Sequence, residues 1–102
     1  MSDLYTVNKS PFEKNALDSC LKFASAGAAI LLIEDGVYGA VKGAASEAKV
    51  TSAMGDKKFY ALGPDLKARG LSEDRVIDGI EIVDYAGFVD LVEANDKVQA
   101  WL

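Results

Sequence analysis

Short apolar runs of strand length alternate with longer helical segments along this chain of 102 residues. Four runs have the composition of strands: Leu4–Val7, Ala28–Ile33, Lys58–Leu62 and Ile80–Val83. Ala28–Ile33 is apolar throughout rather than alternating, which is typical of a strand that helices cover on both faces. Strand–helix alternation with short connections predicts an α/β fold with a mostly parallel sheet.

The first helix has a strong start signal. Ser10 can cap it, Pro11 suits the first helical position, and Glu13 completes a capping box. We expect this helix to run to about Ser25. The short segment Leu66–Arg69 is expected to form another helix, between the break at Gly63-Pro64-Asp65 and Gly70.

Two further helices are expected to follow aspartates that can act as N-caps. Asp35 precedes helical periodicity over Gly36–Ala48, and Asp84 precedes it over Tyr85–Asn95. In the last helix the apolar residues share one arc, which predicts core packing. They are Tyr85, Phe88, Val89, Leu91 and Val92. A closing strand over Lys97–Trp101 would complete a small three-layer domain, with a sheet of about five strands flanked by helices.

Composition removes several classes of function. The chain has no His and a single Cys, so a Ser-His-Asp or Cys-His pair, a His metal ligand and an internal disulfide are excluded. The net charge of −5 argues against nucleic acid and against an acidic membrane surface as direct partners. At this length one domain, residues 1–102, is expected. An unpaired Cys without an export signal or a membrane-spanning segment predicts a cytoplasmic protein.

Cys20 is the strongest nucleophile in the chain and the candidate catalytic thiol. On a helical wheel it lies near the middle of the apolar arc of the first helix, with Leu17 and Phe23 among its neighbours. No basic residue is one helical turn away, so nothing local would lower its pKa. One interpretation is a small buried core residue. The other is a persulfide or redox thiol, which would need a Lys or Arg from another element or another chain.

Three loops follow the strands Leu4–Val7, Ala28–Ile33 and Lys58–Leu62, at the edge where open α/β sheets bind ligands. They are Asn8–Ser10, Glu34–Gly36 and Gly63–Asp65. None carries a glycine-rich phosphate-binding signature. A nucleotide- or flavin-binding domain is therefore the weakest of the functional hypotheses, and no metal or cofactor site is predicted from the residues.

The expected helix over Gly36–Ala48 has almost no polar face. Its polar residues are Lys42, Ser46 and Glu47, and glycines would let another backbone approach closely. A chain of this size has little room to bury a helix on every side. We therefore predict a contact with another subunit, with helix-on-sheet packing as the alternative. The predicted interface residues are Val37, Tyr38, Gly39, Ala40, Gly43 and Ala44.

Five segments, in order over essentially the whole chain, resemble the DsrH/TusB family of sulfur-relay subunits. They are Thr6–Phe12, Leu31–Val37, Tyr60–Leu71, Val83–Val89 and the ending Gln99–Trp101. The resemblance is closer to the DsrH branch of sulfur-oxidising bacteria. It implies a DsrE-like α/β fold, no metal or organic cofactor, and work within a larger complex.

The complex that the resemblance implies is a heterohexamer holding two copies each of three homologous subunits, the DsrE-, DsrF- and DsrH-like chains. It relays persulfide sulfur to a small DsrC/TusE-like acceptor. The sulfur serves intracellular sulfur oxidation in one branch and 2-thiouridine in tRNA in the other. In this family the main carrier Cys belongs to the DsrE-type subunit, so the chain is expected to be either a carrier through Cys20 or a structural docking subunit.

Overall fold

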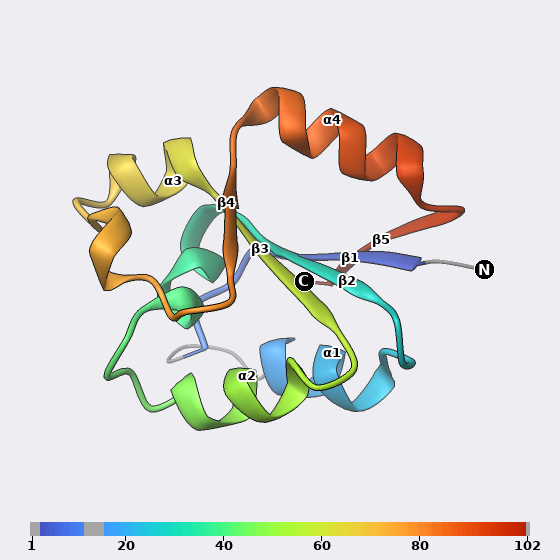
Figure 1. The fold of residues 1–102 in the computed structure, drawn as a ribbon, viewed down its shortest axis with the longest axis horizontal. Coiled ribbons are helices and arrows are strands. Elements are labelled where there is room, and N and C mark those ends of the chain that lie inside the picture. The colour runs from blue at the N-terminus through green and yellow to red at the C-terminus, as the bar shows by residue number, and fades with distance from the viewer. Residues whose placement is uncertain (1–2, 12–15, 102) are drawn as a thin grey trace.

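The computed structural model describes residues 3–11 and 16–101, and its centre is a five-stranded parallel sheet. The strands stand in the spatial order β4-β3-β2-β1-β5 (Figure 1). Their bounds are β1 (Asp3–Val7), β2 (Ala29–Leu32), β3 (Lys58–Leu62), β4 (Glu81–Val83) and β5 (Lys97–Trp101). The predicted α/β class is confirmed, and every pair of neighbouring strands is parallel.

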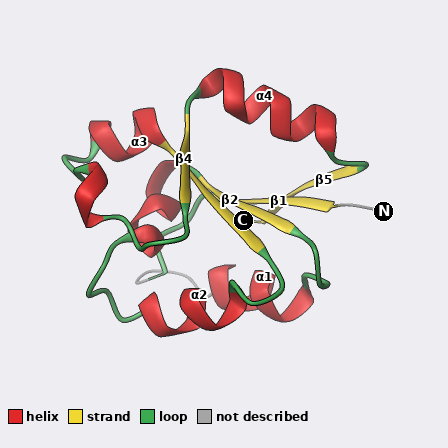
Figure 2. Ribbon diagram, viewed as in Figure 1, coloured by secondary structure: helices red, strands yellow, loops and turns green. Residues whose placement is uncertain are grey.

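Helices lie on both faces of this sheet, but unequally (Figure 2). The helices are α1 (Ala16–Phe23), α2 (Glu47–Ala53), α3 (Gly63–Ala68) and α4 (Tyr85–Ala94), with 3-10 helices η1 (Glu34–Ala40) and η2 (Glu73–Arg75). From β1 to β4 the chain steps across the sheet in one direction, and it then returns past β1 to form β5. Because parallel crossovers are right-handed, the returning crossover, α4, lies on the face opposite α1 and α2.

The two faces of the sheet bury different amounts of apolar surface. The larger core lies between the sheet and α1, α2, η1 and α3, and includes Val7, Leu32, Phe59 and Leu66. The smaller core lies under α4, where Phe88 and Leu91 are packed against a few strand residues. Its fully buried members are Leu4 and Leu31. The face that carries α4 is therefore the less completely covered one.

The prediction of one helix over Gly36–Ala48 is wrong. The chain forms η1 to Ala40, then makes an isolated antiparallel bridge from Val41 to Val76, and begins α2 at Glu47. Gly43 adopts a left-handed backbone with φ of 80°, a conformation that ends helices and that glycine adopts at little cost.

Of the two aspartates predicted as helix N-caps, Asp84 is confirmed and Asp35 is wrong. Asp84 caps α4, since its Oδ1 accepts a hydrogen bond of 2.8 Å from the backbone N–H of Gly87. Asp35 is not a cap, because it lies inside η1 and binds Arg69. The capping box at Glu13 lies outside the described residues. Within the described part of the chain, no helix is long and apolar enough to cross a membrane.

Candidate functional site

Cys20 is completely enclosed by the larger core. Its relative exposure is 0%, and it lies on α1 between the buried side chains of Ala16, Leu17 and Ala24. The position of Cys20 in the middle of the apolar arc is therefore confirmed. The thiol belongs to the layer between α1 and the sheet, and it is not presented to solvent.

The electrostatic environment of Cys20 disfavours a thiolate. Burial raises the pKa of the Cys20 thiol to about 11, and Lys57 acts in the opposite direction without overcoming it. Only 10% of the Lys57 side chain is exposed, and its Nζ lies 3.0 Å from Asp56 Oδ1. The nearest cation that acts on Cys20 is therefore Lys57 of the same chain, directly before β3. Because burial outweighs the effect of Lys57, the thiol remains protonated near neutral pH.

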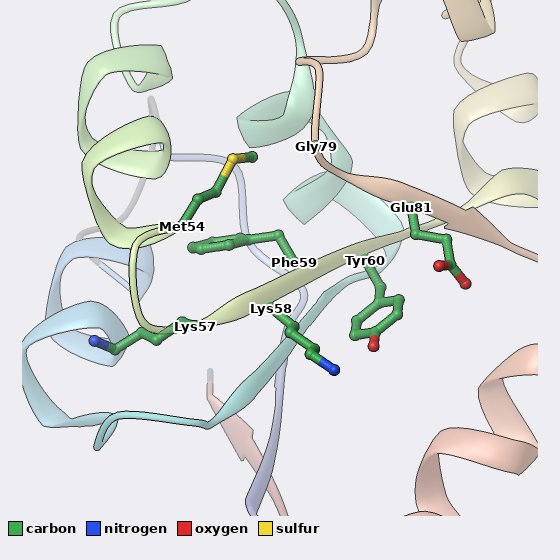
Figure 3. A pocket seen from close by; sticks show the side chains of 7 residues that line it. All are labelled: Met54, Lys57, Lys58, Phe59, Tyr60, Gly79 and Glu81. Carbon is green, nitrogen blue, oxygen red and sulfur yellow. The ribbon is translucent and has the colours of Figure 1, made fainter.

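A cavity of about 370 Å³ opens beside Lys57, at the amino end of β3 and β4 (Figure 3). Its walls are formed by Met54, Lys57, Lys58, Phe59, Tyr60, Gly79 and Glu81. Figure 3 shows Lys57 directed away from Lys58, Tyr60 and Glu81. Burial raises the pKa of the Tyr60 hydroxyl, and the Glu81 carboxylate raises it further. The lining does not include Cys20, so this cavity offers no access to the thiol.

The loops after β1, β2 and β3 meet, as the sequence predicted. The backbone N–H of Glu34 donates to Asp65 Oδ2 at 2.7 Å, and Asn8 Nδ2 lies 3.5 Å from Glu34 Oε2. Arg69 pairs with Asp35 at 2.9 Å and lies 3.9 Å from Asp65. The polar groups of this edge mainly satisfy one another. Among the described residues, no group of three His, Cys, Asp or Glu side chains could hold a metal ion.

The predicted interface residues do not form one surface. Val37, Gly39 and Ala40 are buried within this chain, Tyr38 and Ala44 are partly buried, and Gly43 is exposed. A Cβ on Gly39 would lie 3.2 Å from a methyl group of Leu17, so its small size serves packing inside the molecule. A partner contact at these six residues stays a prediction, but the helix without a polar face that motivated it does not exist.

The large exposed apolar residues lie outside the predicted interface. Their elements were predicted to pack in the core or were given no role. Among the described residues the large exposed ones are Phe23, Tyr85, Val89, Val92 and Val98. Three of these five lie on α4. A signal was available in the sequence, because α4 has more apolar residues than one buried face of a helix can accommodate.

The family model described as "DsrH like protein" matches residues 9–98, which is most of the chain. The chain belongs to the DsrH/TusB family. A Protein TusB from Photorhabdus laumondii is 35% identical over 98 residues, covering 96% of this chain and 99% of that protein. A Protein TusB from Escherichia coli strain K12 is also 35% identical, and one from Pectobacterium parmentieri is 31% identical, with the same coverage.

Solved structures support the same fold for this DsrH-like chain. The ychN protein from E. coli matches with a TM-score of 0.80 at 19% identity, covering 98% of this chain and 99% of that one. MTH1491 from Methanobacterium thermoautotrophicum, a protein of unknown function, matches with a TM-score of 0.73 at 15% identity, over 96% and 97% of the two chains. At these identities the likeness concerns the fold alone.

Within the DsrH-like fold, the residues with chemical potential are dispersed. Cys20 is sealed in one core, the paired charges of Asp35 and Arg69 close the carboxyl edge of the sheet, and the exposed apolar residues of α4 lie on the opposite face.

Proposed function

We propose that this chain is a subunit of a cytoplasmic sulfur-relay complex. The observation that carries the proposal is membership of the DsrH/TusB family over residues 9–98, with a TusB relative that aligns over 99% of its own length. The parallel sheet and its flanking helices agree with it. The partners would be homologous DsrE- and DsrF-like subunits in an α2β2γ2 hexamer, together with a DsrC/TusE-like sulfur acceptor.

We assign this subunit a structural and docking role rather than that of a sulfur carrier. In a relay step, an acceptor thiolate attacks the terminal sulfur of a donor persulfide, the S–S bond breaks, and the donor leaves as a thiolate. A carrier must therefore expose a thiolate to two different proteins. Cys20 has neither exposure nor a lowered pKa. We accordingly propose that the carrier thiol belongs to the DsrE-type partner.

Thiol labelling of the assembled complex tests this assignment. After treatment with a persulfide donor, intact-mass spectrometry should show a gain of about 32 Da (one sulfur atom) on the DsrE-type subunit and none on this chain. Alkylation of Cys20 should be slow in the folded protein and fast after denaturation. A persulfide adduct on Cys20 of the folded complex would instead make this chain a carrier.

The use of the relayed sulfur has two candidates. The resemblance to the DsrH branch favours intracellular sulfur oxidation through a DsrC-like acceptor. The TusB names of the curated relatives favour delivery toward 2-thiouridine in tRNA. Deleting the gene separates the two. Loss of 2-thiouridine from total tRNA supports the second use, and loss of growth-linked sulfur oxidation with intact tRNA supports the first.

A further inference from the structure

The outer side of α4 carries an apolar stripe that nothing in the described chain covers. Tyr85 is 61% exposed, Val89 is 55% exposed and Val92 is 39% exposed. Phe88 and Leu91, on the adjoining side of the same apolar arc, are packed against the sheet. The apolar arc of α4 is therefore wider than the side that faces the sheet, and only part of it is buried within this chain.

The position of α4 in the fold leaves this stripe accessible. It alone among the described helices covers its face of the sheet, and Figure 1 shows it apart from α1 and α2. Among the elements that the structure describes, no second helix lies beside it to bury Tyr85, Val89 or Val92. On the same face, Val98 of β5 pairs in register with Leu4 and remains 46% exposed. A further exposed apolar side chain therefore lies on the face of the sheet that α4 covers.

The spacing of the stripe suits a helical partner. Tyr85, Val89 and Val92 follow one another at intervals of four and three residues. This is the repeat with which one helix packs along another, as in a coiled-coil seam. A second helix with an apolar seam of its own can pack along this side of α4.

The charges beside the stripe indicate which charges a partner would carry. Asp90 and Glu93 each follow a stripe valine by one residue, which places both carboxylates about 100° to the same side of the stripe. Within the described residues neither forms an ion pair. One edge of the stripe is therefore acidic and unpaired. A partner helix that carries Lys or Arg along the facing edge would complement it.

We propose that the outer stripe of α4 docks a helix of a different subunit, whose apolar seam is bordered by basic residues. A second copy of this chain is the poorer occupant. An antiparallel twofold pairing of α4 would set the acidic edge of Asp90 and Glu93 against itself. The inference rests on the proposed function, because the partner is one of the homologous subunits of the relay complex. The proposal places the contact with another subunit on α4 instead of on the six residues predicted from the sequence.

Co-expression with the DsrE- and DsrF-like subunits tests the proposal. Val89→Glu places a charge in the centre of the stripe and should weaken assembly at least about 30-fold, as expected at the centre of an interface. Thr51→Glu, on the exposed side of α2, is the matched control and should assemble like the wild type. The double variant Asp90→Lys, Glu93→Lys should weaken assembly about 10-fold, and added salt should reduce that difference. Circular dichroism of each isolated variant verifies folding.

The outcomes separate this inference from the proposed function. Assembly of Val89→Glu and of the charge-reversed variant at wild-type affinity would overturn α4 docking and leave the relay complex standing. Failure of the wild-type chain to assemble at all would overturn both. A wild-type chain that dimerises by itself, and loses the dimer in Val89→Glu, would show that the stripe binds a second copy instead. Should Val89→Glu misfold, the charge-reversed variant decides alone.

Discussion

At the scale of single residues, the environment of Cys20 decides which role this chain can take. The helical wheel predicted its burial from sequence, since the apolar residues around it are local neighbours on α1. The effect of Lys57 on Cys20 was not predictable in the same way. Lys57 directly precedes β3, and it acts on Cys20 only because α1 packs on the sheet. Short-range periodicity describes one helix face, whereas the electrostatic partner of a buried group depends on long-range packing.

The raised pKa of Cys20 predicts a loss of stability at alkaline pH. The folded-state pKa of about 11 lies above the reference value of 9.0, so the folded chain holds the thiol proton more tightly. The stabilising contribution is therefore complete below about pH 9 and is lost as the pH rises through 11. The stability difference between the wild type and Cys20→Ala should fall by up to about 3 kcal/mol over this interval. Urea unfolding of both proteins at pH 8 and pH 10.5 measures it, and a constant difference would contradict the burial account.

The close packing around Gly36 predicts a second effect of a single residue, on stability. A Cβ at this position would overlap the carbonyl oxygen of Val7, so the backbone of η1 must move away from β1 to accept it. Gly36→Ala should destabilise the protein by about 3 kcal/mol or more. Gly55→Ala is the control, because its Cβ would meet only Ser52 O at 3.7 Å, and its effect should stay within about 0.5 kcal/mol. Equal thermal midpoints for the two variants would show that the close approach is absent.

At the scale of elements, the strands were predictable and the segment from residue 36 to 48 was not. Apolar runs bounded by turn residues are strong strand signals, and β3 and β5 have the predicted bounds. The segment after Asp35 has small residues at nearly every position, so helical periodicity and close tertiary packing give the same pattern. The structure uses these residues for packing, with Gly39 against Leu17 and Val41 bridged to Val76.

The cap of α4 can be tested directly. Asp84→Ala removes the acceptor of the Gly87 N–H and should lower the free energy of unfolding by about 1 kcal/mol. Asp90→Ala, on the same helix, removes a carboxylate that forms no ion pair in the described chain and should have a smaller effect. The two variants should be compared by chemical denaturation. A cost for Asp90→Ala as large as that for Asp84→Ala would argue against a specific capping contribution.

At the scale of the whole molecule, the topology explains what the sequence pattern of α4 left undecided. The arc of Tyr85, Phe88, Val89, Leu91 and Val92 predicted core packing, and this is correct only for Phe88 and Leu91. Within the described chain, the chain returns across the sheet once, so that one helix covers that face and its exposed side has no neighbour there. Family resemblance predicted the fold and a partner-dependent function, but the accessible surface depends on the order of the strands.

The whole molecule is expected to be needed in the relay complex, whereas its Cys20 thiol is not. The most direct measurement is transfer of labelled persulfide sulfur from a donor to the acceptor protein, in a complex reconstituted with the wild-type chain, with Cys20→Ala, and without this chain. We predict equal transfer with the first two and a loss of at least about 10-fold without the chain, a factor that corresponds to 1.4 kcal/mol. Undiminished transfer in its absence, or loss of transfer with a folded and assembled Cys20→Ala chain, would contradict the account.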